Sequence, residues 1–199
     1  MDWIFALALG YFAGSIPFGI LLTRIAGAGD LRSIGSGNIG ATNVLRTGRK
    51  GLAVATLLLD LLKGLGAVLA ARLTFPDGPD IPDLYAGVGA VLGHCFPVWL
   101  RFRGGKGVAT LAGVCFGFGW PIGLGYAVLW LGLLAITRIS SVGGMSAAIG
   151  APLVAIFAGY PYYSLGLVLL AALVLWNHRE NIARLRAGTE PRIGGSKPK

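Results

Sequence analysis

A run of glycines and small polar side chains from Gly35 to Arg46 carries the residue types that bind phosphate. Glycines let the backbone turn tightly enough for several N–H groups to converge on one oxyanion. Hydroxyl and amide side chains add hydrogen-bond donors, and the arginine adds charge. A solvated glycine linker is the alternative, but it does not explain the interspersed Asn and Thr. The run lacks the G-x-x-x-x-G-K-[ST] pattern of nucleotide hydrolysis. We predict phosphate contacts from Gly35, Ser36, Gly37, Asn38, Gly40, Thr42, Asn43 and Arg46.

A second cluster, Gly104-Gly105-Lys106-Gly107, opens an apolar segment. Backbone N–H groups at the start of a helix attract anions, and Lys106 supplies a full charge. A simple topology signal would explain the charge but not the Gly-Gly-Lys-Gly pattern. We therefore predict that Gly104, Gly105 and Lys106 also bind phosphate.

The third cluster follows the last apolar segment and contains His178 and Asn181. An imidazole at a membrane exit can titrate or donate a hydrogen bond, so we predict a catalytic or orienting role for His178. Asn181 is a candidate donor. His94 stands alone among apolar residues and is interpreted as a packing residue. Asp60 and Lys63, three residues apart on one helix, are interpreted as a structural ion pair outside the site.

The rest of the chain is too apolar for a soluble domain. Of 199 residues, 55% are hydrophobic and 13% are charged, whereas soluble domains have roughly 25% charged residues. The apolar residues come in blocks of about 17–25, the length of a membrane-spanning helix. The 33 glycines predict closely packed helices. The fold class is therefore an all-α polytopic membrane protein.

The net charge of +9 does not indicate nucleic acid, because the basic residues stand at the ends of apolar segments. Expected spans cover 3–25, kinked at Pro17, then 51–72, 83–100, 107–137 as one or two crossings, 142–158 and 161–177. Seven transmembrane helices fit the breaks in the apolar pattern at 119–121, 138–141 and 159–161 best, and five helices are the alternative. The positive-inside rule puts the N-terminus and the acidic turn at 74–83 outside, and the C-terminus in the cytoplasm. We expect a single domain, 1–199, whose cytoplasmic loops at about 26–50 and 101–107 and tail at 178–199 form the site.

Other chemistry finds less support. Cys95 and Cys115 lie in or beside apolar spans without metal-ligand spacing and are interpreted as packing residues. The cytoplasmic segments hold too few acids for a metal-dependent phosphotransferase, so no metal or other cofactor is expected. A transporter of a phosphorylated solute is the rival class, but no internal repeat is visible.

Three blocks in order resemble the bacterial acyl-phosphate:glycerol-3-phosphate acyltransferase family (PlsY). They are Gly14–Gly19 leading to Gly35–Arg46, Gly93–Pro97 leading to Gly104–Thr110, and Asn181–Leu185. The resemblance covers nearly the whole chain. It implies a multi-pass enzyme of the bacterial inner membrane, with its active site on the cytoplasmic side. It implies nothing about the oligomeric state. Its partners would be acyl phosphate, glycerol 3-phosphate and membrane lipid. The resemblance assigns substrate binding and catalysis to Ser36, Arg46, Lys106, His178 and Asn181.

The implied reaction moves a fatty acyl group from acyl phosphate to the 1-hydroxyl of glycerol 3-phosphate, giving lysophosphatidate and phosphate. Acyl phosphate already carries a good leaving group, so positioning and charge neutralisation suffice and no acyl-enzyme is expected. Either His178 or a substrate phosphate oxygen accepts the hydroxyl proton, and we favour the substrate.

Overall fold

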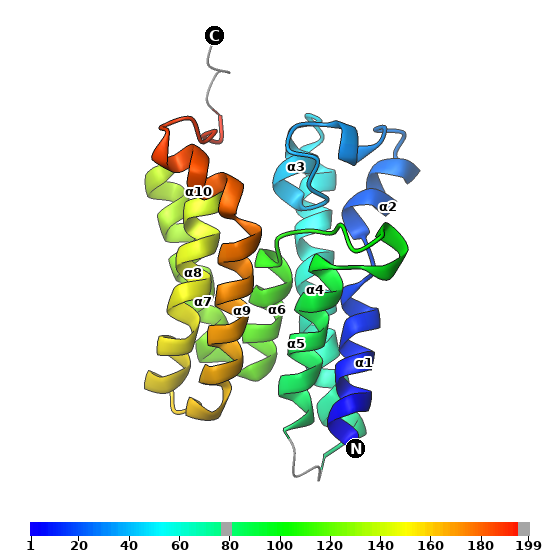
Figure 1. Ribbon diagram of the computed structural model, residues 1–199, viewed down its shortest axis with the longest axis vertical. Coiled ribbons are helices and arrows are strands. Elements are labelled where there is room, and N and C mark those ends of the chain that lie inside the picture. The colour runs from blue at the N-terminus through cyan, green and yellow to red at the C-terminus, as the bar shows by residue number, and fades with distance from the viewer. Residues whose placement is uncertain (77–80, 195–199) are drawn as a thin grey trace. The chain divides into compact units, whose positions relative to one another are not determined.

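The computed structural model describes residues 1–76 and 81–194, and all regular structure within these ranges is helical (Figure 1). The chain divides into two compact units, one from Met1 to Phe118 and a second that begins at Gly119. The first unit contains α1 (Asp2–Gly14), α2 (Phe18–Ile25), η1 (Leu31–Ser33), α3 (Ala41–Leu45), α4 (Lys50–Thr74), α5 (Pro82–Cys95), η2 (Val98–Leu100) and α6 (Val108–Phe118). The second contains α7 (Trp120–Thr137), α8 (Ser140–Phe157), η3 (Pro161–Tyr163), α9 (Ser164–Asn177) and α10 (Arg179–Arg186).

Within the described part of the chain, four helical stretches are long and apolar enough to cross a membrane: Asp2–Ile25, Lys50–Thr74, Trp120–Thr137 and Ser140–Phe157. A fifth is reached if Pro161–Asn177 and Arg179–Arg186, which are bent by 60°, count as one span. The predicted breaks at 119–121, 138–141 and 159–161 each contain the start of a helix: α7 begins at Trp120, α8 at Ser140 and η3 at Pro161. The expected span at 83–100 is wrong at its end, because α5 stops at Cys95. Pro97 lacks an N–H and disfavours helical backbone at the residue before it.

Glycines let α1 and α5 pack backbone against backbone. A β-carbon on Gly10 or Gly14 of α1 would overlap the carbonyl oxygens of Ala86 or Ala90 on α5. A β-carbon on Gly93 of α5 would likewise overlap the carbonyl oxygen of Tyr11. Small residues four apart allow such close approach in a membrane, where the hydrophobic effect does not drive helices together. The predicted close packing is confirmed in this helix pair.

The break between α1 and α2 at Ser15–Pro17 frees backbone carbonyls, which side chains from two other segments satisfy. The indole N–H of Trp99 donates to the carbonyl oxygen of Ser15 at 2.6 Å. The ammonium group of Lys63 donates to the carbonyl oxygen of Ile16 at 2.8 Å. Lys63 Nζ also lies 2.7 Å from Asp60 Oδ1, and both side chains are buried. The predicted kink at Pro17 and the predicted ion pair on α4 are therefore parts of one arrangement.

Of the acidic turn predicted to face outward, Asp77 and Asp80 lie outside the described residues. Asp83 begins α5, and its carboxylate pairs with Arg72 Nε of α4 at 2.7 Å. The Arg72 guanidinium also donates to the carbonyl oxygen of Phe118 at 3.1 Å. These contacts join the ends of α4, α5 and α6, opposite the polar loops of the same unit.

Candidate phosphate-binding loops and polar tail

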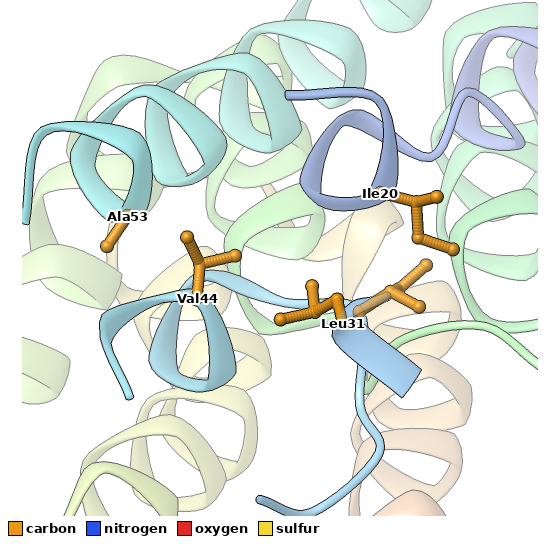
Figure 2. Packing of buried hydrophobic residues seen from close by; sticks show 5 residues of the cluster. Ile20, Leu31, Val44 and Ala53 are labelled. Carbon is orange, nitrogen blue, oxygen red and sulfur yellow. The ribbon is translucent and has the colours of Figure 1, made fainter. Parts of the chain in front are cut away.

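An apolar cluster fastens the glycine-rich loop to the helices of the first unit (Figure 2). The glycine-rich loop is the connection at about 26–50 between α2 and α4. Its residues Leu31, Ile39 and Val44 are buried against Ile20 of α2 and Ala53 of α4. These three buried apolar residues anchor the loop, while Ser36 and the glycines beside it stay exposed. The loop is therefore an ordered element and not a solvated linker.

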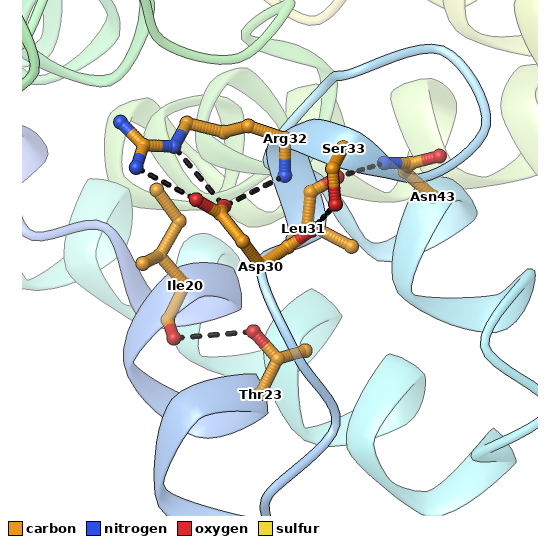
Figure 3. Close-up of polar contacts among 7 residues, drawn as sticks. All are labelled: Ile20, Thr23, Asp30, Leu31, Arg32, Ser33 and Asn43. Atoms are coloured by element: carbon orange, nitrogen blue, oxygen red, sulfur yellow. Dashed lines mark hydrogen bonds and ion pairs between the residues drawn. The ribbon is translucent and has the colours of Figure 1, made fainter.

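Asn43 is the hydrogen-bonding centre of this loop. It is 2% exposed, and its Nδ2 lies 2.9 Å from the carbonyl oxygens of Leu31 and Ile34 and 2.8 Å from that of Asn38. Figure 3 shows the bond to Leu31. Its Oδ1 accepts from the backbone N–H of Ser36 at 3.2 Å. The expectation that Asn43 donates to phosphate is thus corrected, because both amide hydrogens are already given to the loop's own carbonyls.

Backbone donors in the loop are also partly used internally. The N–H of Gly37 donates to the carbonyl oxygen of Ile34 at 3.0 Å. The N–H of Gly40 donates to Asn38 Oδ1 at 2.9 Å, forming a turn that leads into α3. With the Ser36 N–H bound to Asn43, three of the N–H groups predicted to converge on an oxyanion instead stabilise the loop.

The side chains of Ser36, Thr42 and Arg46 are exposed on this loop. The Arg46 guanidinium crosses the loop, where a β-carbon on Gly35 would lie 2.9 Å from its Nη1 and 2.5 Å from Asn43 Oδ1. Gly35 also has a φ of +58°, so both its conformation and its contacts require glycine. The loop therefore presents two hydroxyls and one cation, as a phosphate requires.

The loop begins at an exposed ion pair (Figure 3). Arg32 donates from its backbone N–H at 3.0 Å and from Nη2 at 2.8 Å to the Asp30 carboxylate. These hydrogen bonds, the side-chain one first, lower the pKa of Asp30 to about 2. Asp30 thus caps η1 as a carboxylate, and it is not a candidate proton carrier.

The second predicted loop folds back onto the end of α5. The N–H of Gly104 donates to the carbonyl oxygen of Cys95 at 3.0 Å, and that of Gly105 donates to the carbonyl oxygen of His94 at 2.9 Å. Leu100, from the same connection, packs against the apolar cluster beneath the glycine-rich loop. The structure therefore brings the two predicted phosphate loops to one end of the first unit, and Lys106 stands at the start of α6.

In the second unit, His178 lies at the bend between α9 and α10 and is 3% exposed. Its Nδ1 lies 2.7 Å from the carbonyl oxygen of Val174. Because a carbonyl oxygen only accepts, Nδ1 carries the proton, and a neutral ring then has its lone pair on Nε2. This is the tautomer that a proton acceptor at Nε2 needs.

Glu190 organises the polar tail, and sequence reasoning missed it. Its Oε1 accepts from Asn181 Nδ2 and, at 2.6 Å, from Ser141 Oγ, and its Oε2 lies 2.7 Å from Arg184 Nε. Burial raises the pKa of Glu190, but these hydrogen bonds outweigh it, and the net shift is downward. Asn181 is thereby held in place by a carboxylate. The available signal was a carboxylate close to several arginines in the tail.

The tail also pairs with the connection between α7 and α8. The N–H of Ile193 donates to the carbonyl oxygen of Arg138 at 2.7 Å, and Arg138 Nη2 donates to the carbonyl oxygen of Ile193 at 3.1 Å. Arg138 and the tail thus share one end of the second unit, as the predicted topology requires.

Across 1–76 and 81–194, no group of three or more His, Cys, Asp or Glu side chains is placed to hold a metal ion.

Comparisons with known proteins agree on one family. The family model described as glycerol-3-phosphate acyltransferase matches residues 4–188. A glycerol-3-phosphate acyltransferase of Novosphingobium aromaticivorans is 64% identical over 197 residues, covering 99% of this chain and 98% of the relative. Another, of Erythrobacter litoralis, is 60% identical over 194 residues, covering 98% of this chain and 96% of the relative.

Solved structures give the same result. A crystal structure of PlsY, an integral membrane glycerol 3-phosphate acyltransferase, in its glycerol 3-phosphate form matches with a TM-score of 0.89 at 39% identity, covering 98% of this chain and 96% of that chain. The lysophosphatidic acid form matches with a TM-score of 0.87 at 37% identity, covering 96% and 95%. The fold is therefore shared with an integral membrane enzyme.

Proposed function

The chain belongs to the glycerol-3-phosphate acyltransferase family, and we propose that it transfers a fatty acyl group from acyl phosphate to the 1-hydroxyl of glycerol 3-phosphate. The products are lysophosphatidate and inorganic phosphate. One observation carries this proposal: two ordered loops at one end of the first unit, anchored by Asn43 and Leu100, carry Ser36, Arg46 and Lys106. Both substrates of the proposed reaction bear a phosphate for such groups to bind.

The proposed chemistry needs no covalent intermediate. The 1-hydroxyl oxygen attacks the acyl carbonyl carbon, the bond between that carbon and the phosphate oxygen breaks, and phosphate leaves with the bonding electrons. One phosphate lies in the glycine-rich loop against Ser36 and Thr42, and Arg46 with Lys106 holds the other. Neutralising two anions lets them approach, and fixing both reactants replaces a bimolecular encounter with an oriented one.

The family resemblance assigns His178 and Asn181 to substrate binding and catalysis as well. The hydroxyl proton goes to an oxygen of a substrate phosphate, and His178 orients the reactants. Replacing His178 with Gln separates the two assignments, because a general base contributes roughly 10²–10⁴-fold to the rate. A drop of less than about 10²-fold supports transfer to the substrate, and a larger drop assigns the proton to His178.

We further propose seven membrane crossings, with the N-terminus outside and the C-terminus in the cytoplasm of a bacterial inner membrane. Beyond the four long spans and the bent pair, α5 and α6 would be short crossings of roughly 21 and 16 Å at 1.5 Å per residue. Their close packing against α1 and α4 supports this assignment, since glycines at both interfaces meet backbone carbonyls. Cysteines placed singly in the loops at 26–50 and in the tail should react only with membrane-permeant reagents in intact cells.

The decisive experiment compares donors on the purified protein in detergent. Acyl phosphate should support lysophosphatidate formation that depends on glycerol 3-phosphate, whereas acyl-CoA and acyl carrier protein should not. Uptake of glycerol 3-phosphate by vesicles without any acylation would instead indicate a transporter. Formation of product from acyl-CoA alone would overturn the proposed donor.

A further inference from the structure

His94 lies beneath the second phosphate loop, although as a lone histidine it suggested packing alone. It is 4% exposed in the last turn of α5. A β-carbon on Gly105 would overlap His94 Nε2, so the Gly105 backbone rests directly on the imidazole edge. The carbonyl oxygen of His94 also accepts from the Gly105 N–H at 2.9 Å. Lys106 follows Gly105 directly, so the contact between Gly105 and His94 fixes the position at which the Lys106 backbone begins.

The other edge of the ring faces a buried carboxylate. His94 Nδ1 lies 3.7 Å from Asp60 Oδ1 of α4. His94 Nδ1 has no hydrogen-bond partner among the described residues, whereas Asp60 Oδ1 already pairs with Lys63 Nζ at 2.7 Å. Buried polar atoms that face each other are normally joined directly or through one water. Asp60 is itself fixed by Lys63, which holds the broken first span at Ile16.

From these contacts we infer that His94 is a positioning residue for the phosphate loop that ends in Lys106. Asp60 orients the ring, and the ring supports Gly105. The direction in which Lys106 and the neighbouring backbone approach a substrate phosphate is thereby set. This inference rests on the proposed function. A residue that only filled space would not need a carboxylate on one edge and a glycine on the other.

Three variants separate support from packing. His94→Gln keeps a polar atom near the position of Nε2 and should retain substrate affinity within about threefold of the parent. His94→Asn keeps a donor toward Asp60 but no longer reaches Gly105. Because small misplacements of a positioning group reduce efficiency up to about 10²-fold, we expect His94→Asn to lower kcat/KM by 10- to 100-fold. Val91→Ala, a buried change one turn earlier on α5, controls for lost packing.

The informative readout is the KM of each substrate for the purified, full-length protein. Lys106→Ala identifies the substrate whose phosphate this loop binds, and His94→Asn should raise that same KM with a smaller effect on kcat. Val91→Ala should lower thermal stability and leave both KM values unchanged. If His94→Asn lowers kcat while both KM values stay unchanged, or behaves as His94→Gln does, the positioning role is overturned.

Three failures are distinguishable in these measurements. An unmodified protein that is inactive with acyl phosphate refutes the proposed function. If Lys106→Ala raises one KM and His94→Asn does not, only the role of His94 is refuted. If Lys106→Ala changes neither KM, the loop binds no phosphate and both the site assignment and the role of His94 fall.

Discussion

Removing both charges of the buried Asp60–Lys63 pair should harm this protein less than removing either one. Asp60→Leu leaves the Lys63 ammonium without its counter-ion, although it still donates to the Ile16 carbonyl oxygen. Lys63→Met leaves the carboxylate unpaired and also removes the donor that satisfies Ile16. The double variant loses that hydrogen bond and the contact between Asp60 and His94, but it keeps neither charge of the pair.

The magnitudes follow from the burial of both side chains. Removing one partner of a buried ion pair costs about 3–5 kcal/mol, because an uncompensated charge remains. Leaving the Ile16 carbonyl unsatisfied adds about 1–3 kcal/mol, and this is the main loss expected in the double variant. The loss of unfolding free energy in the double variant should therefore be smaller than the sum of the two single losses by about 3 kcal/mol or more. The second substitution thus partly rescues the first.

The free energy of unfolding in lipid bicelles measures this coupling for the four proteins of the cycle. The exposed pair Asp30–Arg32 is the matched control, and its double-alanine variant should show no rescue, since solvent screens both charges. Additive losses in the Asp60–Lys63 cycle, with the double variant the least stable, would refute the argument that this pair carries buried charge at the break between α1 and α2.

Further predictions concern the loop, the tail, the helix packing and the phosphate contacts. Asn43→Asp removes both amide donors, each worth about 1–3 kcal/mol when buried, so hydrogen exchange should rise across 31–43 but not in α4. Because the folded-state pKa of Glu190 is lowered, its stabilisation is complete above the ordinary glutamate pKa of about 4.3. It is lost as the pH falls through the lowered value, and Glu190→Gln should remove this acid-dependent loss in thermal melts. Gly14→Ala should destabilise by about 1–3 kcal/mol through overlap with Ala90, whereas Gly66→Ala, which meets nothing, should not. Arg46→Ala should weaken substrate binding by about 2 kcal/mol, with Arg24→Ala as the exposed control, and near-normal affinity would refute this role of Arg46.

The sequence was sufficient to predict helical segments and most of their ends. Apolar blocks set the lengths, and the breaks at Pro17, Gly119 and Gly159 follow from residues that favour the end or the interruption of a helix. The end of α5 was placed too late because Val98–Leu100 is apolar, and hydropathy does not separate a helix from a short turn that follows one. Pro97 carried the necessary signal.

The sequence indicated which residue types are present in the candidate site, but it did not indicate which partners their side chains contact. Sequence reasoning selected the glycine-rich loop as a phosphate site, which stays a prediction. It treated Asn43 as a ligand group, because composition cannot tell a donor facing a substrate from one that faces the loop's own carbonyls. Glu190 and His94 were passed over for a related reason. Folding brings Glu190 close to Asn181 and His94 close to Asp60, and neither pair belongs to one sequence motif.

A single-turnover experiment tests the central claim most directly, namely that positioning two phosphate-bearing substrates is enough for acyl transfer. Enzyme in excess over labelled acyl phosphate is mixed with or without glycerol 3-phosphate, and the reaction is quenched in acid. The account predicts phosphate and lysophosphatidate in equal amounts and at the same rate, with neither formed when glycerol 3-phosphate is absent. Rapid phosphate release without the acceptor, accompanied by acyl label on the protein, would contradict it.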